Sequence, residues 1–198
     1  MVALDPITPS ATVIADAAAV LAAGGVVAFP TETFYGLAVR ALDGPLVRRL
    51  FALKGRPESQ PILVLVGDPA QIDGFATVTE PARALMARHW PGPLTLVLSA
   101  HASVPSELTA GTGTIGVRCS SHAVARALAA AAGDPITAPS ANRTGAPPPT
   151  TAREVLDTFE GRIELVLDGG ATPGGPASTV LDLTVEPPRV LREGAVKL

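Results

Sequence analysis

Hydrophobic and polar residues form alternating blocks along this chain, and the spacing within each block indicates helices and strands in turn. Apolar residues from Val13 to Leu21 recur at intervals of three and four positions, the period of a helix with one buried face. Ser10 stands where helix N-caps are favoured, and Gly24 stands where helices end. We therefore predict a first helix between Ser10 and Gly24.

The same spacing predicts four more helices, at residues 45–53, 80–89, 121–132 and 152–159. Thr151 and Glu154 form a capping-box pattern at the start of the last one. Short apolar runs between proline, glycine or polar residues predict strands. These runs lie at residues 26–29, 62–66, 94–98, 115–118, 136–138, 165–167, 179–183 and 189–191.

Alternating helices and strands indicate an α/β (α+β) fold, built on one twisted mixed sheet with flanking helices. The chain has 198 residues, a length that suits one domain with its own core. No repeat or long linker divides it, so we interpret residues 1–198 as a single domain. The 20 prolines collect in short segments between predicted strands, where they predict stiff loops.

Composition narrows the class of protein. Hydrophobic residues make up 47% of the chain and charged residues 17%, which argues against disorder. Cys119 is the single cysteine, so it excludes an internal disulfide and a cysteine-based zinc site. There is no run of 18 apolar residues and no basic-then-apolar start, and we expect a soluble, cytoplasmic protein with no membrane partner. The net charge of −3 argues against nonspecific binding of nucleic acid, but it does not exclude a local basic cleft.

The basic residues are unevenly chosen. Among 15 of them, only Lys54 and Lys197 are lysines. Lys54 and Arg56 stand two residues apart beyond a predicted helix, where both side chains can reach one polyanion. A solvated helix end, with cations favoured by the helix dipole, is the alternative. Arginine occupies every other internal basic position of the chain. The lysine at position 54 therefore indicates a site that needs a compact ammonium group instead of a planar guanidinium.

Three other loops at strand ends carry groups that bind anions. Ser140 and Asn142 follow the predicted strand 136–138 and suit either an anion-binding turn or an ordinary Asx turn. Thr114 and Arg118 bracket another strand, and a glycine-rich stretch precedes Ser178 and the strand that ends before Arg192. We interpret Trp90 as a structural anchor of a rigid turn. The three separated histidines and Cys119 form no metal-binding or nucleophilic pattern.

Taken in order, six motifs resemble the YrdC/Sua5 family. They are Pro30-Thr-Glu-Thr33-Phe-Tyr-Gly36-Leu, Lys54-Gly-Arg-Pro57, Trp90-Pro-Gly-Pro93, Gly116-Val-Arg118, Pro139-Ser-Ala-Asn142, and Ser178-Thr-Val180 with Leu191-Arg-Glu-Gly-Ala195. The resemblance implies a YrdC/RibB-like fold with a deep, positively charged cavity. It also implies an L-threonylcarbamoyladenylate synthase, a nucleotidyltransferase that uses L-threonine, bicarbonate or CO2, and ATP with Mg2+, and releases pyrophosphate. The product would pass to the machinery that modifies the adenosine next to the anticodon of certain tRNAs.

The resemblance also implies a role for each site residue. Thr33, Arg118 and Ser178 match positions that hold threonine. The positions that contact ATP match Lys54, Arg56, Thr114, Ser140, Asn142 and Arg192. Lys54 and Arg56 would act catalytically by stabilising charge as pyrophosphate leaves. We expect no protein ligand to a metal, since Mg2+ would be held through the ATP phosphates.

Departures from the family pattern affect both substrates. Family members often have Asn or His where this chain has Gln60, His where it has Leu65 and Ser where it has Pro148. The Leu65 side chain offers no hydrogen bond to threonine. Pro148 has neither a hydroxyl nor an N–H. We also expect no C-terminal domain of the kind found in long Sua5 forms. Two alternatives stay open: a related carbamoyltransferase domain, and an RNA-binding module that uses the same cavity. A weak affinity for tRNA or other RNA is compatible with each reading.

Overall fold

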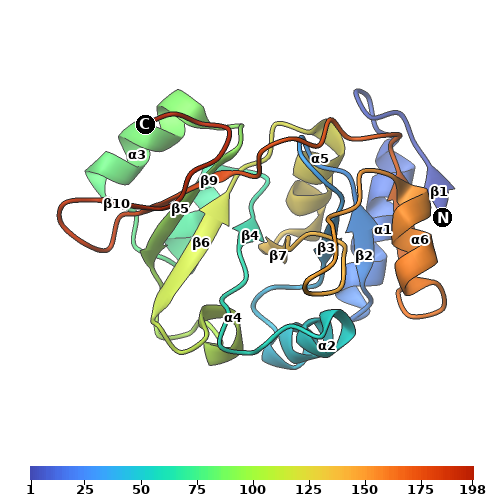
Figure 1. The fold of residues 1–198 in the computed structure, drawn as a ribbon, viewed down its shortest axis with the longest axis horizontal. Helices are drawn as coiled ribbons and strands as arrows, with labels where there is room; N and C mark the ends of the chain where they lie inside the picture. The colour runs from blue at the N-terminus through green and yellow to red at the C-terminus, as the bar shows by residue number, and fades with distance from the viewer.

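The computed structural model describes residues 1–198 and contains two mixed β-sheets with helices around them (Figure 1). The prediction of one sheet was therefore wrong. The four-stranded sheet has the order β1 (Val2–Ala3), β8 (Leu165–Asp168), β2 (Val27–Phe29) and β3 (Gly36–Ala38). The six-stranded sheet has the order β10 (Arg189–Arg192), β9 (Thr179–Asp182), β5 (Leu94–Ser99), β6 (Thr114–Arg118), β4 (Val64–Leu65) and β7 (Ile136–Thr137).

The two sheets meet at the edge strands β3 and β7. The Leu37 amide donates to the Pro139 carbonyl at 2.9 Å, and the Thr137 amide donates to the Val39 carbonyl at 3.0 Å. Isolated bridges, such as Gly36 with Ser140, replace a continuous ladder here. This junction brings the loop before β3 beside the loop after β7.

Helices cover the sheets from several sides (Figure 1). They are α1 (Ala11–Ala22), α2 (Gly44–Lys54), α3 (Glu80–His89), α4 (Ser106–Thr109), α5 (Ala123–Ala132) and α6 (Ala152–Phe159), together with the 3-10 helix η1 (Pro69–Gly74). The capping box between Thr151 and Glu154 is confirmed. Ser10 precedes α1 as predicted, but its side chain makes no capping hydrogen bond. None of the helices combines the length and apolar character needed to cross a bilayer.

Side-chain alternation on β5 and β6 separates the core from the site. Leu94, Leu96 and Leu98 of β5 join the larger buried core, as do Ile115 and Val117 of β6. The residues between them point to the opposite face of the sheet, since successive strand residues alternate. That face carries Thr95 and Val97 on one strand and Thr114, Gly116 and Arg118 on the other, all of which line a cavity.

The predicted elements were mostly found, with two kinds of difference. The bounds predicted for α3 and α6 match the structure, whereas β1, β3, α4 and η1 were not predicted. The run at residues 62–66 contributes only Val64–Leu65 as a strand. This short strand is nevertheless covered by a neighbour on each side, because it pairs with both β6 and β7.

Candidate active site

A cavity of about 590 Å³ opens over the face of the six-stranded sheet formed by β5, β6 and β9. Three loops complete its wall: the loop before β3, the loop after α2, and the loop after β7. Its lining contains three arginines and no carboxylate. Seven of the residues singled out from the sequence line it: Thr33, Arg56, Thr114, Arg118, Ser140, Ser178 and Arg192.

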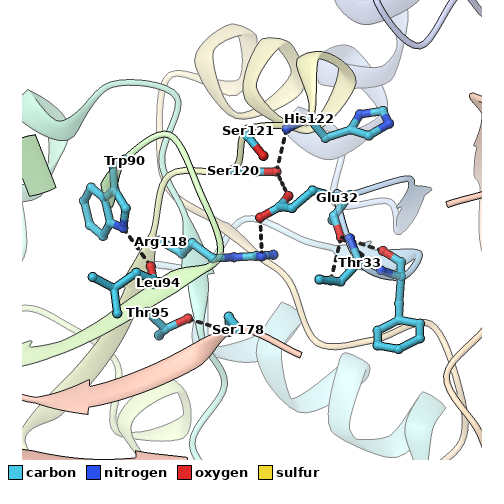
Figure 2. A network of polar contacts seen from close by, with 12 residues as sticks. Glu32, Thr33, Trp90, Leu94, Thr95, Arg118, Ser120, Ser121, His122 and Ser178 are labelled. Atoms are coloured by element: carbon cyan, nitrogen blue, oxygen red, sulfur yellow. Dashed lines mark hydrogen bonds and ion pairs between the residues drawn. The ribbon is translucent and has the colours of Figure 1, made fainter. Parts of the chain in front are cut away.

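Arg118, at the end of β6, is the most buried cation of the cavity wall. Its side chain is 4% exposed and its Nη1 atom donates to a carboxylate oxygen of Glu32 at 2.7 Å. The other oxygen of Glu32 accepts a hydrogen bond from the Ser120 hydroxyl (Figure 2). Arg118 is therefore held by an ion pair that also reaches the segment before α5.

One nitrogen of the same guanidinium has no partner. The Nε atom of Arg118 is buried and makes no hydrogen bond. The pKa of Arg118 is lowered, mainly because the side chain is buried. The Glu32 carboxylate opposes this shift, and the neighbouring Arg192 guanidinium adds to it. An unpartnered donor on a buried cation is costly. Because this cation lines a cavity, an anionic ligand is the partner that would satisfy it.

Ser178 and Arg192 form a second polar group at the start of β9. Arg192 donates from Nε and Nη2 to the Ser178 carbonyl, at 3.0 and 2.8 Å, and from Nη2 to the Ser178 hydroxyl at 2.9 Å. The hydroxyls of Ser178 and Thr95 lie 2.9 Å apart (Figure 2). Burial lowers the pKa of Arg192. The hydroxyl of Ser178 is thus oriented by two neighbours at the cavity wall.

The loop between β2 and β3 carries Thr33. Its hydroxyl lies 3.2 Å from that of Thr31, which donates to the Phe34 carbonyl at 2.7 Å. The Tyr35 hydroxyl donates to the Gly170 carbonyl at 2.7 Å. This bond joins the loop to the glycine-rich segment, and burial raises the pKa of Tyr35 to about 12. The hydroxyl of Thr33 is therefore presented by a well-braced turn.

Lys54 and Asn142 lie behind the cavity wall and do not line it. The Lys54 ammonium, 2% exposed, donates to the carbonyl oxygens of Ser140 and Asn142. The Asn142 amide donates to the Arg143 and Ala146 carbonyls, and its side-chain oxygen accepts from the Ser140 hydroxyl. In this structure Lys54 holds the loop that presents Ser140, and its contact with phosphate stays a prediction.

Arg56 and Thr114 lie on the cavity wall. Arg56 donates from Nη2 to the Pro61 carbonyl at 2.9 Å and from Nε to the Gln60 carbonyl at 3.2 Å, and burial lowers its pKa. The hydroxyl of Thr114 lies 2.9 Å from that of Thr112. On this side of the cavity, Arg56 is therefore held by backbone carbonyls and Thr114 by a neighbouring hydroxyl.

The three departures from the family pattern occupy different environments. Pro148 lines the cavity. Leu65 is fully buried in the smaller core cluster and does not line the cavity. Gln60 is engaged through its backbone: its carbonyl accepts from Arg56 Nε, and its amide donates to the Pro57 carbonyl at 3.1 Å. The substitution at Pro148 is therefore the one in direct contact with the cavity.

Three polar residues that contact the candidate site were not predicted from the sequence. Glu32 and Ser120 complete the Arg118 network, and Thr95 orients Ser178. A signal existed for Glu32, because a buried arginine needs an anionic partner and Glu32 stands in the polar loop beside Thr33. Trp90 is structural as predicted: its indole N–H donates to the Leu94 carbonyl at 2.7 Å (Figure 2), and it does not line the cavity.

The fold and site define a mixed α/β protein with a cavity lined by three arginines and several hydroxyl side chains. The model of the Sua5/YciO/YrdC family, described as "Telomere recombination", matches residues 19–194. The chain therefore belongs to this family. It is 45% identical over 183 residues to the threonylcarbamoyl-AMP synthase of Pyrococcus abyssi, and the match covers 92% of this chain and 54% of that protein.

Two further relatives support the assignment. The threonylcarbamoyl-AMP synthase of Bacillus subtilis is 43% identical over 185 residues, covering 92% of this chain and 54% of the relative. The crystal structure of P. abyssi Sua5 complexed with L-threonine superposes with a TM-score of 0.93 and 42% identity, over 98% of this chain and 58% of that one. The chain thus spans about half the length of these relatives.

Proposed function

We propose that this chain is an L-threonylcarbamoyladenylate synthase, which makes threonylcarbamoyl-AMP and pyrophosphate from L-threonine, bicarbonate or CO2, and ATP. The observation that carries the proposal is the Arg118 guanidinium, which belongs to a residue of the cavity lining, is buried, and has an Nε atom without a hydrogen-bond partner. A substrate carboxylate suits such a cation. The crystal structure of P. abyssi Sua5, a member of the same family, complexed with L-threonine supports an amino acid as the source of that carboxylate.

The cavity would carry a positive field that also receives ATP. Arg56, Arg118 and Arg192 line it without an opposing carboxylate in the lining. Arg56, Thr114, Ser140 and Arg192 would contact the nucleotide, while Thr33, Arg118 and Ser178 would hold threonine. Because the lining offers no carboxylate to a metal, Mg2+ would enter as part of the MgATP substrate, held through the phosphates.

The reaction requires orientation more than a protein nucleophile. The threonine amine attacks CO2 and loses a proton, giving a carbamate. A carbamate oxygen then attacks the α-phosphorus of ATP, the bond to the bridging oxygen breaks, and pyrophosphate leaves with the electron pair. Fixed cations stabilise the charge that grows on the pyrophosphate. Holding three substrates together supplies the remaining acceleration.

A turnover assay tests this proposal. The purified chain is incubated with MgATP and bicarbonate, with and without L-threonine, and pyrophosphate is measured. We expect release that depends on threonine and falls strongly in Arg118→Ala. Release that is equal without an amino acid would contradict the proposal. If the chain makes threonylcarbamoyl-AMP, this product would serve the transfer machinery that modifies tRNA. Tight, salt-sensitive RNA binding without turnover would instead favour the RNA-binding alternative.

A further inference from the structure

Glu32 stands behind the cavity wall and makes its contacts with the wall's most buried cation. We propose that Glu32 is a positioning residue, which sets the orientation of the Arg118 guanidinium so that its free edge meets the carboxylate of the amino-acid substrate. The inference rests on the proposed function for the identity of that substrate. Glu32 is not among the lining residues, so its role is exerted through Arg118.

The carboxylate of Glu32 is fixed from two sides. Arg118 Nη1 donates to one oxygen at 2.7 Å, and the Ser120 hydroxyl donates to the other. Ser120 itself is anchored, because its hydroxyl oxygen accepts from the His122 amide at 3.2 Å just before α5. Figure 2 shows Glu32 between Arg118 and Ser120. Glu32 therefore joins the β2–β3 loop, the end of β6 and the start of α5.

This arrangement divides the guanidinium into two edges. Nη1 is occupied by Glu32, whereas Nε has no partner. An arginine presents its N–H groups in a planar fork, so fixing one edge fixes the direction of the other. The remaining edge can then take a carboxylate through two parallel hydrogen bonds, a geometry that depends strongly on orientation.

The charge of Glu32 has a second effect. Arg118 is 4% exposed, and the nearby Arg192 guanidinium disfavours its charged form. A buried cation without a counter-ion is unfavourable. Glu32 offsets both effects without entering the cavity, so the lining keeps its positive groups for substrates.

Kinetics of Glu32 variants test the proposal. Glu32→Ala should raise the KM for L-threonine about tenfold or more, because a buried partner of a charge pair is removed. The KM for ATP should change much less than the KM for threonine, since Arg56 and Thr114 lie elsewhere on the wall and, of the residues assigned to ATP, Arg192 is the one that neighbours Arg118. Glu32→Gln keeps an oxygen acceptor for Arg118 and should recover a large part of threonine binding.

Glu164→Ala is the matched control. Glu164 pairs with Arg49 at 2.7 Å and accepts from the Val26 amide, but it does not line the cavity or touch Arg118. Its loss should lower stability and leave the KM for threonine unchanged. Equal increases in both KM values for Glu32→Ala, or a threonine KM no higher than that of Glu164→Ala, would overturn the positioning role.

A structural readout separates this inference from the proposed function. Crystal structures of the wild type and of Glu32→Ala are compared, both without substrates. In the variant, the Arg118 guanidinium should be turned away from the position that it has in the wild type. An unmoved guanidinium would overturn the inference even where the wild type turns over threonine. If the wild type shows no threonine-dependent turnover, the proposed function fails, while a displaced guanidinium still supports the control of Arg118 by Glu32.

Discussion

The Lys54 ammonium donates a hydrogen bond to the carbonyl oxygen of Asn142 at 2.6 Å, across 88 residues of sequence. A second bond reaches the Ser140 carbonyl. The last residue of α2 is thereby tied to the loop after β7, which presents the Ser140 hydroxyl to the cavity. Lys54 supports the site from behind in this structure, and its two hydrogen bonds connect the Lys54-Gly-Arg-Pro57 motif with the Pro139-Ser-Ala-Asn142 motif.

Lys54 should titrate at an unusually low pH. Burial, and then the neighbouring Arg56, lower the pKa of Lys54 from 10.5 to about 8. Only two lysines are present in the sequence, so Lys197→Arg leaves a single lysine signal. We expect its side-chain 13C resonance to shift with a midpoint near pH 8. A midpoint near 10.5, the ordinary value for lysine, would contradict the buried position.

The same pKa shift predicts how stability depends on pH. Between about pH 8 and 10.5, folded Lys54 has lost its proton while the unfolded chain retains it. The unfolded state then binds more protons, so the free energy of unfolding should rise with pH in this window. Chemical denaturation of Lys54→Met should lack that rise, whereas an identical pH dependence in both proteins would argue against this linkage.

Replacing Lys54 should abolish the proposed activity while leaving the chain folded. Lys54→Ala removes two charge-assisted hydrogen bonds to the 140–142 loop, each worth about 1.5–3 kcal/mol. We expect threonine-dependent pyrophosphate release to fall by about a hundredfold or more, the loss that corresponds to about 2.7 kcal/mol. Circular dichroism should show retained secondary structure. Near-normal turnover would remove Lys54 from the site.

Arg56 should be required as a guanidinium and not only as a charge. Its planar fork binds the Gln60 and Pro61 carbonyls and still faces the cavity. Lysine keeps the charge but loses the fork, so Arg56→Lys should raise the KM for ATP about tenfold. Arg153→Lys, at an 80% exposed position on α6, is the control and should leave both KM values unchanged. Equal kinetics for the two variants would rule out this role.

Gly67 should be intolerant of a side chain for steric reasons alone. A Cβ atom there would lie 2.5 Å from backbone atoms of Ala130 in α5. Gly67→Ala should therefore destabilise the protein by about 1–3 kcal/mol, visible as a lower Tm. Gly74→Ala has open space around it and should change stability by less than about 0.5 kcal/mol. Similar Tm values for the two variants would contradict this packing.

Local signals explain what the sequence could predict. The bounds of α3 follow from helical periodicity and the proline in its first turn, and those of α6 from periodicity and its capping box, signals that depend on residues a few positions apart. The split into two sheets depends on pairings such as that of β2 with β8, far apart in the chain. Strand β3 has only three residues, Gly36–Ala38, too few for a periodic pattern.

The candidate site shows the same division. Arg118 and Ser178 stood at predicted strand ends, and both line the cavity. Their partners Glu32 and Thr95 lie 86 and 83 residues away in sequence, so spacing could not pair them. The position of Lys54 behind the wall likewise depends on the fold of the 140–142 loop. Residue types were therefore predictable, whereas their mutual contacts required the tertiary structure.

The most direct test of the central claim follows carbon from bicarbonate into the product. The purified chain is incubated with MgATP, 13C-bicarbonate and either L-threonine, L-serine or L-valine, and the nucleotides are examined by mass spectrometry. We expect an adenylate that contains both threonine and the 13C label, formed together with pyrophosphate and most abundantly with threonine. An adenylate without the label, or pyrophosphate release that is indifferent to the amino acid, would contradict it.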